Sequence, residues 1–197
     1  MRKDENETGT KSPIGWTVAG LAFAMTVLSC PPALAGMQTA GPGLAPQAFY
    51  KFCERDPVNC NSTTGAKVVQ LTPNRKRELA YVNSAINRRI REMSDIRTRG
   101  IEDDWRQGVS QGDCEDFAIA KKNALLKRGW PASALLLTVV RERFGSGGHT
   151  LLTVRTSKGD LVLDNRSGRV KDWMRTPYRY YARQSQSATG EWDLIAR

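Results

Sequence analysis

The sequence predicts a single α+β domain in which N-terminal helices pack on an antiparallel sheet. Two helical segments come first, between residues 72 and 128, and apolar or alternating segments separated by turn residues follow them. This order differs from the regular alternation of strands and helices in βαβ proteins. The 197 residues, 40% of them hydrophobic and 25% charged, suit one ordinary globular domain. They exclude collagen-like, coiled-coil and wholly disordered chains.

The first 35 residues have the features of an export signal. Residues 14–29 carry no charge, and Ala33 and Ala35 are the small residues that fit a cleavage site before Gly36. A membrane-spanning helix needs about 20 apolar residues, which is more than this segment offers. We therefore expect a signal peptide over residues 1–35, cleaved after Ala35. The alternatives are an uncleaved N-terminal anchor and lipid attachment at Cys30.

Export changes the expected state of the cysteines. Cys30 would leave with the signal peptide, so that Cys53, Cys60 and Cys114 would remain in an oxidising compartment. The loop between Cys53 and Cys60 is short enough to close as a disulfide, which would stabilise the fold by about 2–3 kcal/mol. Cys114 is then unpaired, and such a thiol is either buried and inert or kept free for its chemistry.

The segments before the first helix are expected to be irregular. Residues 36–48 are rich in Gly, Pro and Ala and predict a flexible leader, followed by a domain that spans residues 49–197. Within that domain, residues 49–60 predict a compact loop closed by the disulfide. A polar turn over residues 61–65 then leads towards the helices.

Two helices are predicted next. Thr72 can cap the first, and Pro73 suits its first position. Apolar residues then recur at steps of three and four, which predicts a core-facing stripe. Residues 94–111 are polar and predict a connecting loop. The second helix is expected from Asp113 to Arg128, since Gly129 and Pro131 end it.

Five strands should follow the second helix. The run at residues 134–140 is almost wholly apolar, which is typical of a central strand buried on both faces. The second and third strands are joined by a turn over residues 157–160. The remaining strands are expected at residues 149–156, 161–163, 178–183 and 192–195.

Cys114 is placed as a nucleophile would be. With Asp113 as the N-cap, Cys114 becomes the first residue of the second helix, where the helix dipole favours a thiolate and free backbone N–H groups can receive an oxyanion. The ordinary alternative is a capping box completed by Asp116, with the cysteine as filler. Because nearby carboxylates raise the pKa of a thiol, a histidinium or a bound cation would have to offset them.

His149 is the only histidine, so a mechanism that needs a histidine base for Cys114 must use this residue. Asp164 ends the following strand and could orient the imidazole. Directly opposed residues of a hairpin share a face. The turn signal lies about two residues too late for His149 and Asp164 to be directly opposed, so a bulge or a splayed end is required.

These residues lie in segments that together resemble the bacterial transglutaminase-like cysteine proteinases, a family that includes the LapG-type periplasmic proteases. The resemblance covers most of the chain after the signal. It extends upstream to Phe52, Cys53 and Cys60 and downstream to residues 178–184, and it includes Gly112–Ala118, Gly129–Pro131, Gly148-His149 and Gly159–Asn165.

The resemblance implies a papain-like, transglutaminase-like fold and a periplasmic location. Residue by residue, it implies Cys114 as nucleophile, His149 as general base and acid, and Asp164 as the orienting carboxylate. The implied substrate is a cell-surface protein such as a biofilm adhesin, and the implied inhibitor is a membrane signalling protein.

The resemblance also implies calcium dependence, with Asp113 and Glu115 as candidate ligands and Asp116 as a third. Calcium prefers several oxygen ligands. Further ligands would come from residues 94–105, with Asp95, Asp103 and Asp104 as candidates.

Two other functions are compatible with the residues. The same triad could transfer the acyl group to an amine, as transglutaminases do. Alternatively, the net charge of +10 and the basic, aromatic segment at residues 166–183 could serve a non-catalytic exported module that binds anionic polymer. Because export argues against nucleic acid as the partner, none is expected. Contact with the membrane is expected only through an uncleaved signal.

Overall fold

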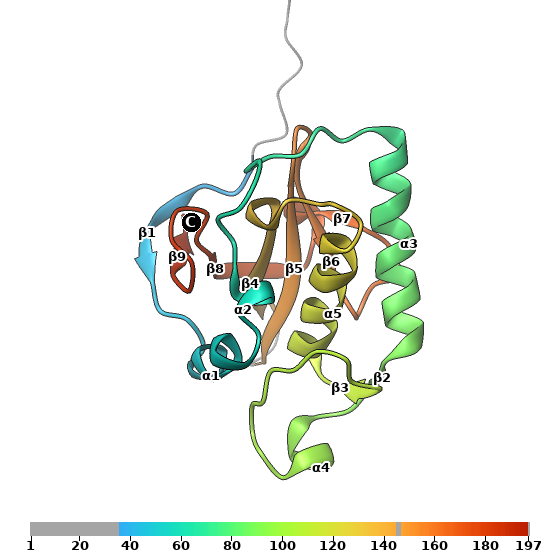
Figure 1. Cartoon of the computed structure of the whole chain (residues 1–197), viewed down its shortest axis with the longest axis vertical. Helices are drawn as coiled ribbons and strands as arrows, with labels where there is room; N and C mark the ends of the chain where they lie inside the picture. The colour runs from blue at the N-terminus through green and yellow to red at the C-terminus, as the bar shows by residue number, and fades with distance from the viewer. Residues whose placement is uncertain (1–35, 145–146, 197) are drawn as a thin grey trace, which may run out of the picture. The chain divides into compact units, whose positions relative to one another are not determined.

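The computed structural model describes residues 36–144 and 147–196. The predicted signal peptide lies outside these residues. A seven-stranded antiparallel sheet, in the order β1-β9-β8-β4-β5-β6-β7, forms the centre of the described part, with helices α3 and α5 on one side (Figure 1). The predicted α+β class with an antiparallel sheet is therefore confirmed. Among the described residues, no helix has the length and apolar character needed to cross a membrane.

The helices are α1 (Gln47–Arg55), α2 (Pro57–Cys60), α3 (Pro73–Arg89), α4 (Asp95–Arg99) and α5 (Cys114–Leu126), with short 3-10 turns η1 (Ala132–Ala134) and η2 (Trp173–Arg175). The sheet strands are β1 (Thr39–Gly43), β4 (Leu135–Glu142), β5 (Gly148–Thr156), β6 (Gly159–Leu163), β7 (Lys171–Asp172), β8 (Tyr178–Gln184) and β9 (Trp192–Ile195). A separate parallel pair joins β2 (Arg91–Glu92) to β3 (Gln111–Gly112).

Helix α5 lies between the sheet and α3. It packs against β4 and β5 on one side and against α3 on the other. Most of its residues are therefore buried, including Lys121 and Lys122. The main apolar core fills this space, and a smaller buried cluster of Val140, Leu151, Val162 and Tyr178 covers the other face of the sheet. The sheet thus has a packed face on each side of its central strands.

The predicted helix at Pro73 is confirmed, since the side chain of Thr72 accepts a hydrogen bond from the backbone N–H of Arg75 and caps α3. The second predicted helix is also present, and it begins at Cys114. All five predicted strands are present within about two residues of their expected bounds, and β4 is central because it pairs with both β5 and β8.

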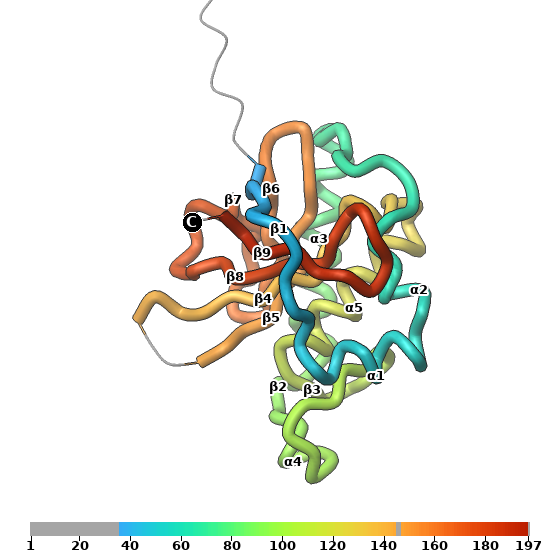
Figure 2. Tube along the Cα trace, turned by 90° about the vertical axis from the view of Figure 1, so that its left-hand side faces the viewer, coloured from blue at the N-terminus to red at the C-terminus, as the bar shows by residue number. Residues whose placement is uncertain are grey.

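Three segments differ from expectation. Residues 36–48, predicted as a flexible leader, contain β1, which pairs with β9 along the edge of the sheet (Figure 2). The predicted loop at residues 49–60 is helical instead, because it contains most of α1 and all of α2, and the expected Cys53–Cys60 disulfide joins the two helices. The predicted connecting loop at residues 94–111 contains α4. In each case backbone pairing or packing against the rest of the fold orders a segment that has weak local signals.

Candidate active site

The sulfur of Cys114 lies between the start of α5 and strand β5. Its Sγ accepts a hydrogen bond from the backbone N–H of Thr150 at 3.3 Å, and the thiol donates to Glu115 Oε2 at 3.3 Å. Cys114 is a free cysteine and is partly buried. Because Thr150 follows His149 in the chain, this contact brings the thiol beside the segment that carries the histidine.

His149 and Asp164 are in direct contact. The distance from His149 Nε2 to Asp164 Oδ1 is 2.8 Å, and both side chains are buried. The other ring nitrogen, Nδ1, has no hydrogen-bond partner among the described residues. The imidazole therefore has one nitrogen fixed by a carboxylate and the other available for a reacting group.

Asp164 is held by two further donors. The Tyr178 hydroxyl donates to Oδ2 at 2.6 Å, and the backbone N–H of Arg166 donates to Oδ1 at 3.1 Å. Burial alone would raise the pKa of Asp164, but the hydrogen bonds from His149 and Tyr178 lower it to about 2. The fold thus keeps this carboxylate charged.

The predicted mismatch in the β5–β6 hairpin is real. Leu152 pairs with Leu163, a register that does not place His149 directly opposite Asp164, and the pairing ends there. Asp164 follows the last residue of β6 and reaches His149 diagonally from a splayed strand end. An offset of two residues keeps both side chains on the same face of the sheet, whereas an offset of one would have separated them.

Two carboxyl groups lie beside the thiol, and their hydrogen bonds are only partly satisfied. Asp113 precedes α5 and Glu115 is its second residue, and one carboxylate oxygen of each is buried without a hydrogen-bond partner among the described residues. Burial and the neighbouring Asp113 raise the pKa of Glu115. Burial and Glu115 likewise raise the pKa of the Cys114 thiol. This side of the site therefore needs either a proton or a cation.

Asp113 does not cap α5 through its side chain, contrary to the prediction. Its Oδ2 instead accepts from the backbone N–H of Asp95 at 3.3 Å. The alternative of a capping box completed by Asp116 does not form either, because Asp116 Oδ1 accepts from the backbone N–H of Arg106 at 2.8 Å. Both carboxylates turn away from the helix end and towards the segment that precedes it.

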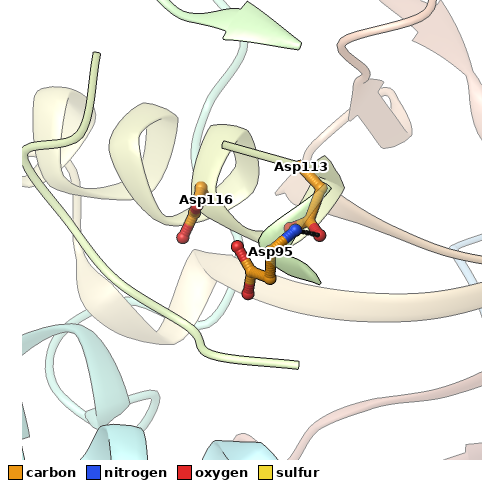
Figure 3. Close-up of side chains that lie close together, drawn as sticks. All are labelled: Asp95, Asp113 and Asp116. Carbon is orange, nitrogen blue, oxygen red and sulfur yellow. Dashed lines mark hydrogen bonds between the residues drawn. The ribbon is translucent and has the colours of Figure 1, made fainter. Parts of the chain in front are cut away.

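That arrangement creates an acidic cluster. Carboxylate oxygens of Asp95, Asp113 and Asp116 lie within 4.8 Å of one another (Figure 3). Burial, together with repulsion from Asp113, raises the pKa of Asp116 to about 7. The guanidinium of Arg99 contacts Asp95 and also lies 3.5 Å from Asp116 Oδ2, and so offsets part of the negative charge.

The other candidate metal ligands lie outside this cluster. Glu115 is directed towards the thiol and Asp113. Asp103 accepts a hydrogen bond from the Trp105 indole, and Asp104 pairs with Arg55 at 2.9 Å. Of the six acidic residues considered from the sequence, the structure brings Asp95, Asp113 and Asp116 together.

Tyr178 is the residue that the sequence did not suggest for this site. Its ring lies 5.4 Å from that of His149, in addition to the hydrogen bond to Asp164. Tyr178 begins β8, which neighbours β4 rather than β6. Only the order of strands in the sheet brings it to the pair, and a local pattern around residue 178 carries no such information.

Comparison with known proteins gives the family. The sequence pattern of the family described as bacterial transglutaminase-like cysteine proteinase BTLCP matches residues 39–197. A calcium-bound structure of Legionella pneumophila LapG has a TM-score of 0.53 and 25% identity, over 64% of this chain and 71% of that one. An EGTA-treated structure of Legionella pneumophila LapG has a TM-score of 0.50 and 21% identity, over 78% and 80%, and it supports the fold.

No curated protein matches the sequence significantly. The family match nevertheless covers the sheet, the helices and every candidate residue described above. The predicted resemblance and the predicted transglutaminase-like fold are therefore confirmed. The chain belongs to the bacterial transglutaminase-like cysteine proteinases and is a cysteine peptidase.

Proposed function

We propose that this protein is an exported, calcium-dependent cysteine endopeptidase that uses Cys114, His149 and Asp164 to cut a cell-surface or periplasmic protein such as a biofilm adhesin. The observation that carries the proposal is the 2.8 Å contact between His149 and Asp164, next to a free thiol held by the N–H of Thr150. The Cys53–Cys60 disulfide supports export, because such bonds persist in oxidising compartments.

The reaction would follow from the free atoms of the site. His149 Nδ1 takes the thiol proton, and Cys114 Sγ attacks the substrate carbonyl. Free N–H groups at the start of α5 face the developing oxyanion. The imidazolium then returns its proton to the leaving amine, and a water molecule, activated by the same nitrogen, releases the acyl group from Cys114. Asp164 stabilises the imidazolium throughout and stays charged.

Deprotonation of the thiol is the demanding step. Burial and Glu115 both raise the pKa of Cys114, which disfavours the thiolate. The carboxyl groups beside it must lose their repulsive effect before attack. A cation bound to them would do this, and His149 carrying the transferred proton would add to the same effect.

The residues present fit calcium. Asp95, Asp113 and Asp116 offer hard oxygen donors within 4.8 Å of one another, and Asp113 Oδ1 has no hydrogen-bond partner among the described residues. Calcium would supply positive charge there and fix the segment before the thiol. Arg99 would have to share or release Asp95 and Asp116 when the ion binds, since its guanidinium contacts both.

The proposal is tested by comparing exported-protein profiles of cells that carry the native chain or Cys114→Ser. We expect one protein fragment to be present with the native chain and absent with the variant, and we expect a calcium chelator to have the same effect as the substitution. Unchanged fragments in both arms would remove the peptidase proposal. If a fluorescent primary amine is instead attached to a protein in a Cys114-dependent way, acyl transfer replaces hydrolysis.

A further inference from the structure

A basic cavity adjoins the proposed catalytic residues. It has a volume of about 330 Å³ and lies between the end of β4, the segment that follows β6, and the start of β8. Asp164 and Tyr178 form part of its wall. Asp164 therefore links the cavity to the proposed catalytic pair, because the same side chain contacts His149 at 2.8 Å.

The cavity wall carries an excess of positive charge. Four cationic side chains line it, namely those of Arg143, Arg166, Arg169 and Lys171, against the two carboxylates of Glu142 and Asp164. Arg166 is paired with Glu142. Asp164 is occupied by His149, Tyr178 and a backbone N–H. Both negative charges are thus already matched.

Two of the cations have no partner among the described residues. The side chains of Arg169 and Lys171 make no hydrogen bond or ion pair with any residue that the structure describes, and Arg169 is exposed. An arginine binds a carboxylate through two parallel N–H groups, and a neighbouring lysine adds a point charge. The unmatched charge in the cavity is therefore suited to a carboxylate from outside the chain.

The cavity also has apolar surface. Phe144 is 93% exposed and borders it, and Val162 and Pro177 contribute to its wall. A polypeptide can supply apolar and acidic side chains together at this spacing, whereas a simple polyanion such as polyphosphate supplies charge alone. The small volume and the position beside Asp164 also differ from the long basic track that a polymer would need.

We infer that Arg169 and Lys171 form a subsite for an acidic side chain of the protein substrate, so that the enzyme prefers Asp or Glu at one fixed position near the cleaved bond. This inference rests on the proposed function. It deepens that proposal because it names the chemistry by which the substrate is selected. Substitution of both cations should reduce the preference without removing the peptidase chemistry.

The first experiment measures binding without cleavage. A peptide library from a digested bacterial proteome is passed over immobilised Cys114→Ala protein, and the retained peptides are sequenced. We expect peptides with Asp or Glu to be enriched roughly three- to tenfold, because charge-assisted contacts at a partly exposed site give modest selectivity. The enrichment should vanish in a protein that also carries Arg169→Gln and Lys171→Gln.

The control removes the same charge elsewhere. Lys76 and Lys127 are exposed and lie outside the cavity. The pair Lys76→Gln and Lys127→Gln should keep the enrichment. A further pair, Arg169→Glu and Lys171→Glu, should reverse the preference towards basic peptides, which misfolding would not produce. Equal retention by the cavity variant and the control pair would overturn the inference.

Two outcomes separate this inference from the proposed function. If the retained peptides show the acidic preference but the native enzyme with calcium does not cut them, the subsite stands and the peptidase proposal fails. If the native enzyme cuts peptides with no preference for Asp or Glu, the peptidase stands and the subsite is rejected. Inorganic polyphosphate that binds the native protein more tightly than every peptide, and loses this binding in the Gln pair, would assign the cavity to a polyanion and reject the subsite.

Discussion

Asp164 and Glu115 are both buried carboxyl groups beside the proposed catalytic atoms, yet their surroundings are opposite. Asp164 receives hydrogen bonds from His149, Tyr178 and a backbone N–H, and its pKa falls to about 2. Glu115 faces Asp113, and burial together with that neighbour raises its pKa. The histidine side is complete within the chain itself. Among the described residues Glu115 has no cationic partner, and this is the side on which we propose that calcium binds.

The largest effect is expected when the contact between Asp164 and His149 is weakened. Asp164→Asn removes the charge that stabilises the imidazolium and can hold His149 in the wrong tautomer, so kcat should fall by roughly 10²–10⁴ with little change in KM. The measurement is the steady-state kinetics of cleavage. The substrate is the intact form of the protein whose fragment is found in the exported-protein profiles. Asp193→Asn, on β9, is the matched control. A fall of less than about threefold would show that Asp164 does not support the base.

The same carboxyl group should make the fold sensitive to acid. Its pKa is about 2 in the folded chain against an ordinary 3.8, so its stabilising contribution is complete above about pH 4 and is lost as the pH falls towards 2. The contribution is on the order of 2 kcal/mol. Thermal melts between pH 5 and pH 2 should show a steeper loss of Tm for the native chain than for Asp164→Asn.

Calcium should stabilise the folded chain by binding to the acidic cluster beside Cys114. At 100 times its Kd, an ion that binds only the folded chain adds about 2.7 kcal/mol, which should raise Tm by several degrees. Asp95→Asn should shrink the calcium-dependent rise in Tm, whereas Glu92→Gln on the exposed β2 should not. Because the readout is the increment on adding calcium, a lower starting Tm does not affect it. An equal increment in both variants would place the ion elsewhere.

Glu115 should give the chelated protein an unusual dependence on pH. A carboxyl group whose pKa is raised by folding binds more protons in the folded state, so stability falls as the pH rises above the ordinary value of 4.5. With calcium removed by a chelator, the Glu115→Gln variant should therefore have a higher Tm than the native chain at pH 8. Its Tm should also change less with pH. The control is Glu54→Gln at an exposed position. If Tm depends on pH in the same way in both variants, the prediction for Glu115 is wrong.

The smallest effect is expected at Tyr178. Tyr178→Phe removes one hydrogen bond to Asp164 and leaves the ring against His149, which costs about 1 kcal/mol and should lower kcat by roughly three- to tenfold. The pKa of Asp164 should rise, so the acid limb of the pH–rate profile should move to higher pH. Tyr181→Phe on the exposed face of β8 serves as control. An unmoved acid limb would make the role of Tyr178 purely structural.

The sequence predicted the elements of this comparison better than their contacts. Apolar runs and turn residues predicted β4, β5 and β6, and the spacing of the turn predicted that His149 and Asp164 would not be directly opposed. The contact nevertheless forms, because pairing stops at Leu163 and leaves Asp164 free to reach back. The end of a strand depends on the tertiary contacts of the residues that follow it, and local β-propensity carries no information about those contacts.

The acidic side shows the complementary limit. A hydrogen bond within its own helix was expected for Asp113 and was the alternative considered for Asp116, as at isolated helix starts. In the fold, the two carboxylates accept hydrogen bonds from the backbone N–H groups of Asp95 and Arg106 instead, because the segment that precedes α5 brings these donors close. Tyr178 was missed for the same reason, because its neighbours lie far away in the sequence.

Strand β1 has a practical consequence for anyone who shortens this protein. The buried N–H of Met37 donates to Asp160 at 2.8 Å, and residues 39–43 cover the outer edge of β9. A recombinant chain that starts at residue 49 would leave β9 as a bare edge with unsatisfied backbone groups, ready to pair with another copy. Preparations trimmed to the helical start of the domain should therefore self-associate, and those that begin at Gly36 should stay monodisperse.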